Sequence, residues 1–320
     1  FPLIVHFSNR KGKLQMRYLV IDVGGTAIKY ALLDENANYS EIQETPTPMD
    51  SLESYLSVLD AIIRQNKQNI DGIAMCVPGI IDSAKGVCVT GGNLRYVNNL
   101  PLVAMLEAKH GLRVSLENDA RCAALAELWK GNLKNCKDGV VMVLGSAVGG
   151  ALVKDGRIHK GSHLSAGEFS FIEKDGDITD IRNSVGYQNG ISNLYRLVEQ
   201  RTGISADELN GVRIFEMASQ GDERVLDAID IFTQGLARII FNIQAIFDPE
   251  LFVIGGGISQ QELLMDSLKN NVNYIYDNIP FTAKRAKVVS CHFLNTSNLV
   301  GALFHHLITT NNPMANAESN

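Results

Sequence analysis

The sequence predicts an α/β fold, and three observations support this prediction. Short β-rich runs alternate with helical patterns along the chain, as in proteins built from layered sheets and helices. Residues 18–39 and 141–158 share one design, in which an apolar strand, a turn of small residues and a second strand follow one another. The 320 residues, 45% of them hydrophobic, suffice for two domains of ordinary size. We therefore expect a duplicated α/β unit whose two copies face each other across a cleft.

The individual elements follow from local patterns in chain order. Ser51 is a suitable N-cap for a helix with one apolar face, and a buried strand at residues 71–82 ends in a Pro-Gly turn. An Ala-rich helix begins just past Asp119 and ends at Gly131. The other predicted elements are helices at 51–66, 223–247, 260–279 and 298–308, a strand before the glycines at 255–257, and a disordered polar tail at 309–320.

Composition excludes several classes of protein. The net charge is −6 with no large basic cluster, so we expect no nucleic-acid partner. No apolar run is long enough to span a bilayer, and we expect no membrane partner. Five scattered cysteines without a CxxC pair indicate reduced thiols in a cytoplasmic protein, with no cysteine zinc site. Residues 1–15, which precede Met16, are expected to be an extension.

The turn after the first strand has the composition of a phosphate-binding loop. Gly24 and Gly25 allow backbone N–H groups to face a ligand without an intervening Cβ, and the hydroxyl of Thr26 stands beside them. Asp22 ends the strand, where its carboxylate can hold Mg²⁺ directly or through water. This turn is a candidate for one side of a triphosphate site.

Two further glycine clusters follow strands. Gly145 and Ser146 lie in the second hairpin and are placed to contact phosphates, while Gly255, Gly256 and Gly257 offer bare backbone to a flat adenosine. Each cluster alone is explained as well by a tight turn, and neither common nucleotide-binding signature is present. Three strand-ending clusters, two of them in matching hairpins, favour nucleotide binding.

Polar residues at other strand ends are candidates for a sugar site. Asp119 follows an apolar strand and opens a helix, so it is either a helix cap or a general base for a substrate hydroxyl, and one residue can do both. Asn118 would orient the sugar. Glu168, after an Ala-Gly turn, and Asn93, after two glycines, are candidates to hold sugar hydroxyls, although each is also compatible with a solvated surface position.

The chain resembles the ROK family of sugar kinases, within the actin/Hsp70/hexokinase-type ATPase superfamily. Five ordered motifs carry the resemblance, and it extends from Met16 to about residue 308. The motifs are "IDVGGTAIK", "VPGIID", "ENDARCAALAE", "LGSAVGGALVKDGRIHKGSHLSAGEFSF" and "VIGGGIS".

The resemblance implies two ribonuclease-H-like, actin-like ATPase domains around a central cleft that binds ATP and Mg²⁺. The smaller domain would span residues 16–118, completed by the helix at 298–308, and the larger would span 119–297. The implied nucleotide-binding residues are Asp22, Gly24, Gly25, Thr26, Lys29, Gly145, Ser146, Gly255, Gly256 and Gly257. The implied sugar-binding residues are Asn93, Asn118, Asp119 as catalytic base, and Glu168. The resemblance also implies a homodimer.

Departures from the family pattern bear on specificity. Typical members have a histidine where this chain has Ser170, followed by a cysteine-rich zinc site, whereas residues 171–190 contain no cysteine. We therefore expect no structural zinc. In the family, that histidine and a glutamate of the zinc motif contact the sugar near its anomeric end. Without these two residues the chain resembles a zinc-free subgroup of β-glucoside kinases, which phosphorylate the 6-hydroxyl of a glucose unit substituted at C1.

Alternative functions are a glucokinase or N-acetylmannosamine kinase, a sugar-responsive repressor, and a sugar-binding protein without catalysis. A repressor of this family carries a winged helix-turn-helix ahead of its kinase-like part, and only 21 residues precede Asp22. Retained acids at positions 22 and 119 argue against loss of catalysis. We therefore expect an ATP-dependent kinase that acts on a small sugar.

Overall fold

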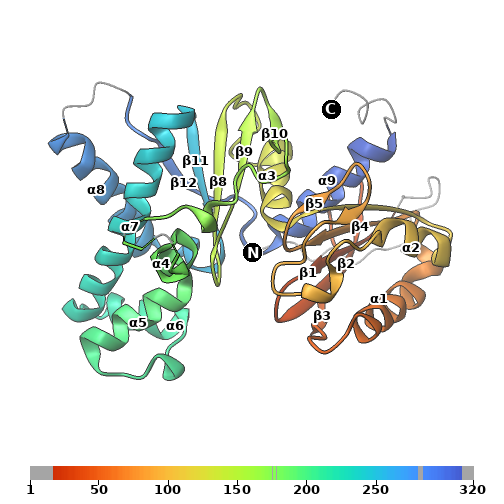
Figure 1. Cartoon of the computed structure of the whole chain (residues 1–320), viewed down its shortest axis with the longest axis horizontal. Coiled ribbons are helices and arrows are strands. Elements are labelled where there is room, and N and C mark those ends of the chain that lie inside the picture. The colour runs from red at the N-terminus through yellow and green to blue at the C-terminus, as the bar shows by residue number, and fades with distance from the viewer. Residues whose placement is uncertain (1–16, 175, 178, 280–283, 312–320) are drawn as a thin grey trace. The chain divides into compact units, whose positions relative to one another are not determined.

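The computed structural model describes residues 17–311 except 175, 178 and 280–283 (Figure 1). The predicted extension at residues 1–15 and the last part of the predicted tail, residues 312–320, lie outside the described residues. The chain divides into two compact units. Unit 1 contains the residues up to Trp129 and those from Thr296 onward, and unit 2 contains Lys130–Asn295.

Unit 1 is built on a five-stranded sheet whose order is β3-β2-β1-β4-β7. The first three strands in this order pair antiparallel, and β1, β4 and β7 run parallel. The strands are β1 Arg17–Val23, β2 Ala27–Asp34, β3 Gln43–Pro46, β4 Gly72–Val77 and β7 Arg113–Asn118, with a separate short ribbon of β5 Ile81–Asp82 and β6 Val87–Cys88.

Helices cover both faces of this sheet because β1 is buried on both sides. Leu19 and Ile21 pack in one apolar cluster with helices α1 (Leu52–Asn66) and α2 (Leu102–His110). The alternate residues of β1 pack in another cluster with α9 (Ser297–Asn311). Ser51 caps α1 as predicted, since its hydroxyl accepts a hydrogen bond from the Ser54 N–H at 3.1 Å.

Unit 2 repeats the sheet plan of unit 1, with the order β10-β9-β8-β11-β12 (Figure 1). An antiparallel hairpin again flanks three parallel strands. The strands are β8 Gly139–Leu144, β9 Val148–Lys154, β10 Arg157–His159, β11 Leu251–Gly255 and β12 Val288–Ser290. The duplication predicted from the two hairpins is therefore present in the strand order.

The helices of unit 2 form its main core with β8 and β11. The central one is α7, whose apolar face packs against α5 and α8. The helices are α4 Val185–Asn189, α5 Ile191–Thr202, α6 Gly211–Ser219, α7 Glu223–Phe247 and α8 Glu262–Asn278. Within the described residues, no helix is both long and apolar enough to cross a membrane.

The structure differs from the predicted elements at three places. Helix α3 (Asp119–Lys130) belongs mostly to unit 1, whereas the sequence placed a domain boundary before it. The reason is its packing against α9, where a Cβ added to Gly301 would lie 1.7 Å from the Cys122 carbonyl oxygen. Residues 309–311 end α9 and are not disordered. A 3₁₀ turn at Gly257–Gln260 precedes α8, which starts later than predicted.

Candidate functional site

The first glycine turn joins β1 to β2 in three residues. Gly24 donates its N–H to the Ala27 carbonyl at 3.0 Å, and its own carbonyl accepts from the Thr47 hydroxyl at 2.7 Å. Gly25 and Thr26 are exposed, and a Cβ at Gly25 would meet nothing within 4 Å. The turn is therefore anchored at its base and open at its tip, as a phosphate loop requires.

Asp22 lies at the end of β1, opposite Lys29 of β2 in the antiparallel register. Its Oδ1 accepts a hydrogen bond from the Cys76 thiol at 3.0 Å, and Asn298 Nδ2 on α9 lies 3.2 and 3.3 Å from the two oxygens. Burial raises the pKa of the Asp22 carboxyl, while the hydrogen bonds from Cys76 and Asn298 and the charge of Lys29 oppose that rise. A half-buried, oriented carboxylate of this kind suits Mg²⁺, directly or through water.

The second glycine turn, Gly145 to Ala147, is exposed and is supported from behind by the start of α5. Gly145 donates to the Ala147 carbonyl at 3.0 Å, and the Ile191 N–H donates to the Gly145 carbonyl at 2.8 Å. A Cβ on Gly190 would lie 2.2 Å from the Ser146 carbonyl oxygen. The first residue of α5 thus binds the Gly145 carbonyl, and Gly190 packs against the Ser146 carbonyl.

The third glycine cluster lies beside the second turn in unit 2. Gly256 has φ +94°, and a Cβ there would lie 2.1 Å from the Leu144 carbonyl oxygen. Leu144 directly precedes Gly145, so the strand ends of β8 and β11 meet at this point. Gly257 is exposed, with nothing within 4 Å of an added Cβ. The fold therefore brings together two of the segments predicted to bind the nucleotide.

The glycine turns of both units, together with Asp22 and Asp119 of unit 1, lie at the carboxyl ends of parallel strands. Asp22, Cys76 and Glu117 stand in register across β1, β4 and β7, so the first glycine turn and Asp119 share one edge of the sheet. The turns at Gly145 and Gly256 share the corresponding edge in unit 2. Open α/β sheets generally bind ligands at this edge.

Asn118 and Asp119, at the corner between β7 and α3, make different contacts. Asn118 is buried, and its Oδ1 accepts the Arg121 N–H at 3.0 Å, which caps the helix. Its Nδ2 donates to the Gly79 carbonyl at 2.9 Å. Asp119 is half-buried, and its Oδ1 accepts the Ala120 N–H at 2.8 Å. Asn118, and not Asp119, therefore supplies the cap.

A buried ion pair lies directly behind this corner. Glu117 and Arg121 are each 1% exposed, and Glu117 Oε1 lies 3.4 Å from Arg121 Nη1. Glu117 Oε1 also accepts the Asn118 N–H at 2.9 Å. The pair was not predicted, and the signal that could have identified it is the i,i+4 spacing of an acid and a base at a helix start.

Asn93 lies on an exposed loop near the same corner. Gly79 has φ +94°, and a Cβ there would lie 2.8 Å from the Gly92 nitrogen, so the Pro-Gly turn packs directly on this loop. Because Asn118 binds the Gly79 carbonyl, the loop of Asn93 is tied to the β7–α3 corner. Asn93, Asn118 and Asp119 are thus gathered in one part of unit 1.

Glu168 belongs to unit 2, on a turn that packs tightly against β9. A Cβ on Gly167, whose φ is +92°, would lie 2.9 Å from the Gly150 carbonyl oxygen. Two residues after Glu168, the Ser170 hydroxyl donates to the Val148 carbonyl at 2.9 Å and lies 3.2 Å from the Val148 N–H. Ser170 therefore fastens the turn of Glu168 to the strand that follows the second glycine turn.

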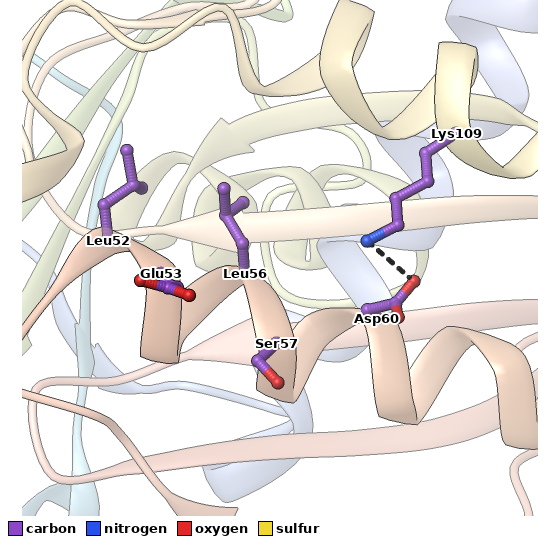
Figure 2. A pocket seen from close by; sticks show the side chains of 6 residues that line it. All are labelled: Leu52, Glu53, Leu56, Ser57, Asp60 and Lys109. Carbon is purple, nitrogen blue, oxygen red and sulfur yellow. Dashed lines mark ion pairs between the residues drawn. The ribbon is translucent and has the colours of Figure 1, made fainter.

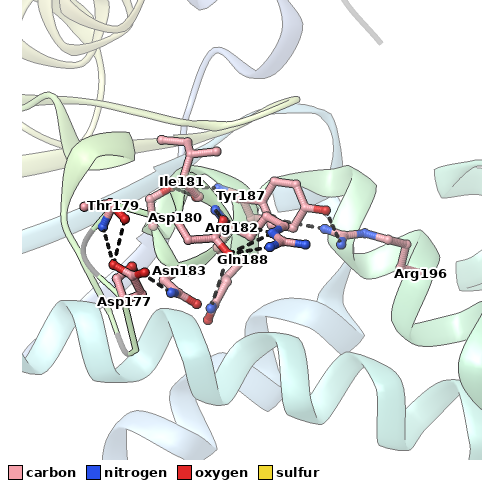
Figure 3. Close-up of polar contacts among 10 residues, drawn as sticks. Asp177, Thr179, Asp180, Ile181, Arg182, Asn183, Tyr187, Gln188 and Arg196 are labelled. Carbon is pink, nitrogen blue, oxygen red and sulfur yellow. Dashed lines mark hydrogen bonds and ion pairs between the residues drawn. The ribbon is translucent and has the colours of Figure 1, made fainter.

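The segment after Glu168 is held by side-chain hydrogen bonds (Figure 3). Asp177 Oδ1 accepts from the N–H and hydroxyl of Thr179 at 2.9 and 2.8 Å, and Asn183 Nδ2 donates to the Asp177 carbonyl at 2.9 Å. Gln188 Nε2 donates to the Arg182 carbonyl at 3.1 Å. In the described residues, no group of three or more His, Cys, Asp or Glu side chains is arranged to hold a metal ion.

Two hollows in the described residues lie away from these positions. One is lined by α1 and α2, where Lys109 Nζ lies 3.2 Å from Asp60 Oδ1 (Figure 2). The other lies in unit 2 and includes Tyr187 and Arg196, whose guanidinium stands 4.2 Å from the centre of the tyrosine ring. Neither hollow is lined by a predicted site residue.

The duplicated sheet plan, with a glycine turn after the first strand of each sheet, defines an actin-like ATPase fold. Residues 18–307 match the model of the ROK family, and the chain belongs to this family.

Named relatives cover almost the whole chain. A β-glucoside kinase of Klebsiella pneumoniae is 29% identical over 91% of this chain and 96% of its own. An N-acetyl-D-glucosamine kinase of Haemophilus influenzae is 27% identical over 88% of this chain and 92% of its own. A solved structure of a ROK family protein from Streptococcus pneumoniae in complex with sucrose has a TM-score of 0.81 and 30% identity, and covers 92% of this chain and 99% of that one.

Proposed function

We propose that this chain is an ATP-dependent carbohydrate kinase that transfers the γ-phosphate of ATP to a hydroxyl of a hexose unit, with Asp119 as general base. Family membership and the kinase relatives support the reaction class. The observation that carries the residue assignment is the division of roles at the β7–α3 corner. Asn118 accepts the Arg121 N–H and so supplies the N-cap bond of α3, which leaves the second carboxylate oxygen of Asp119 without a part in that cap.

The residues present fit ATP and Mg²⁺. The exposed tips of the two glycine turns, at Gly25 and Ser146, offer backbone N–H groups for phosphate oxygens, and Gly257 leaves open backbone for the adenosine. Asp22 would hold Mg²⁺, which neutralises phosphate charge when bound. Asp119 would hold the sugar hydroxyl in line and accept its proton, while Asn93 and Glu168 would bind other hydroxyls. Asn118, whose side chain is bonded to the Arg121 N–H and the Gly79 carbonyl, would orient the sugar. The 6-hydroxyl is the proposed acceptor.

A glucose unit substituted at C1 is the proposed substrate. Ser170 stands where typical members have a histidine that contacts the sugar, and here its hydroxyl is bonded to the backbone of Val148. Phe171, three residues after Glu168, is 70% exposed, and in this proposal it would offer apolar surface to a C1 substituent. β-Glucoside kinases among the relatives support the same class. A homodimer and a cytoplasmic location remain part of the proposal.

A coupled assay with ATP and Mg²⁺ over a panel of sugars tests the proposal. Cellobiose and phenyl β-D-glucoside are expected to have higher kcat/KM than glucose, because the substituent gains contacts that free glucose lacks. N-acetylglucosamine and N-acetylmannosamine serve as competing substrates, since an N-acetylglucosamine kinase is also a relative. A strong preference for free glucose contradicts the β-glucoside assignment. If none of the sugars stimulates ADP release, the kinase assignment is contradicted.

A further inference from the structure

We propose that the buried Glu117–Arg121 ion pair positions the Asp119 carboxylate for proton abstraction, an inference that rests on the proposed kinase function. The two charged side chains are each 1% exposed and lie in the sequence on either side of Asp119. Neither reaches a surface where it would contact the substrate, so neither is a catalytic residue. They act, in this proposal, through the backbone that carries Asp119.

The contacts of the pair surround the β7–α3 corner. Glu117 Oε1 accepts a hydrogen bond from the Asn118 N–H, with an N–O distance of 2.9 Å. It also accepts one from Arg121 Nη1, with an N–O distance of 3.4 Å. The Arg121 N–H donates to Asn118 Oδ1 at 3.0 Å, and Arg121 Nη1 lies 3.4 Å from the Ile81 carbonyl oxygen. These bonds join the end of β7, the first turn of α3 and the ribbon of β5 and β6 around residue 119.

Stability alone is a poor explanation for this pair. Desolvating two charges offsets most of their attraction, and well-packed apolar residues of similar volume are often as stable or more stable in such positions. What an apolar pair cannot do is accept the Asn118 N–H and fix the peptide that leads into Asp119. A general base must lie within hydrogen-bond reach of its hydroxyl, and a misplacement of about 1 Å can cost about 10²-fold in rate.

The test compares three Met variants: Glu117→Met, Arg121→Met and the double variant. Each single variant leaves one charge buried without its partner and is expected to lower Tm sharply. The double variant is expected to regain most of that Tm. Its kcat should nevertheless stay about 10–100-fold below that of the unchanged protein, with a KM for the sugar within a few-fold of the original. Loss of kcat in a protein of restored stability is the signature of positioning.

Arg64→Met is the matched control. Arg64 pairs with Asp60 at the same i,i+4 spacing and a distance of 3.0 Å, but its side chain is 69% exposed. Both kcat and Tm should change little, because exposed ion pairs contribute about 0–1 kcal/mol.

The outcomes separate this inference from the proposed function. An unchanged protein that phosphorylates no sugar refutes the proposed function. If the unchanged protein is active and the folded double variant keeps full kcat, only the positioning inference is refuted. If the double variant does not fold, the double variant Glu117→Leu/Arg121→Leu, which also removes the acceptor of the Asn118 N–H, takes its place. A kcat reduced at least about fivefold in that folded variant, with the sugar KM retained, supports positioning, and full kcat overturns it.

Discussion

At the scale of single residues, the roles at the β7–α3 corner depend on which of two adjacent side chains caps the helix. Sequence alone allowed Asp119 to be a cap, a base or both, because Asn and Asp cap helices about equally well. The bond from the Arg121 N–H to Asn118 Oδ1 assigns the cap to Asn118. A carboxylate and an amide side by side can then divide structural and chemical tasks.

Replacing Asp119 with Asn tests this division. We expect kcat to fall by about 10²–10⁴-fold, because an amide cannot accept the hydroxyl proton. The sugar Kd should change only a few-fold and Tm little, because Asn118 still caps the helix. Asn118→Ala is the stability counterpart and should cost about 1 kcal/mol of unfolding free energy. A near-wild-type turnover rate of Asp119→Asn would remove Asp119 from its assigned role.

At the scale of elements, the glycines after β11 are not equivalent. Gly256 has φ +94°, and a Cβ added to it would lie 2.1 Å from the Leu144 carbonyl oxygen. A Cβ added to Gly257 would meet nothing within 4 Å. Gly256→Ala is expected to cost at least about 2 kcal/mol of unfolding free energy, because it must strain a left-handed residue and separate two strand ends. Gly257→Ala should be near neutral in stability. Urea unfolding of both variants measures this, and equal costs would contradict the argument.

The sequence predicts the elements with strong local patterns but not the contacts between distant elements. The hairpins at residues 18–39 and 141–158 and the long helix at 223–247 carry strong patterns, and all three are present. Helices α5 and α6 were not predicted, although their buried residues recur at helical spacing, at Leu194 and Val198 in α5 and at Ile214, Phe215 and Ala218 in α6. That Gly256 packs on Leu144 depends on the pairing of β11 with β8, which a local pattern does not contain.

At the scale of the whole molecule, residues far apart in the chain define the surroundings of the candidate acids. Asp22 could be predicted from its strand-turn-strand pattern. Its partner Asn298 lies 276 positions later, on a helix that packs back on the first sheet. No spacing rule connects such residues. The sequence therefore identified chemical groups at strand ends but not the side chains that orient them, namely Cys76, Asn298, Glu117 and Arg121.

A buried histidine on the C-terminal helix α9 predicts that the stability of the molecule depends on pH. His306 is buried, its Nδ1 lies 3.0 Å from the Ser115 hydroxyl, and a Cβ on Gly72 would lie 2.5 Å from its Nε2. Burial lowers the pKa of His306 from 6.5 to about 4. Between these values the unfolded chain binds a proton that the folded chain does not, so the contribution of His306 to stability is complete above pH 6.5 and is lost as the pH falls toward 4.

His306→Asn should reduce this pH dependence. From the pKa difference we expect the unfolding free energy of the unchanged protein to fall on the order of 3 kcal/mol over that range. The variant should be less stable at pH 7 but should lose less on acidification. The unfolding free energy of the variant should still fall somewhat on acidification, because burial also lowers the pKa of His110. His163→Asn, at an exposed position, is the control and should follow the unchanged protein. Urea unfolding between pH 4 and 7 decides the matter, since parallel curves for the unchanged protein and His306→Asn would exclude His306 as the source of the pH dependence.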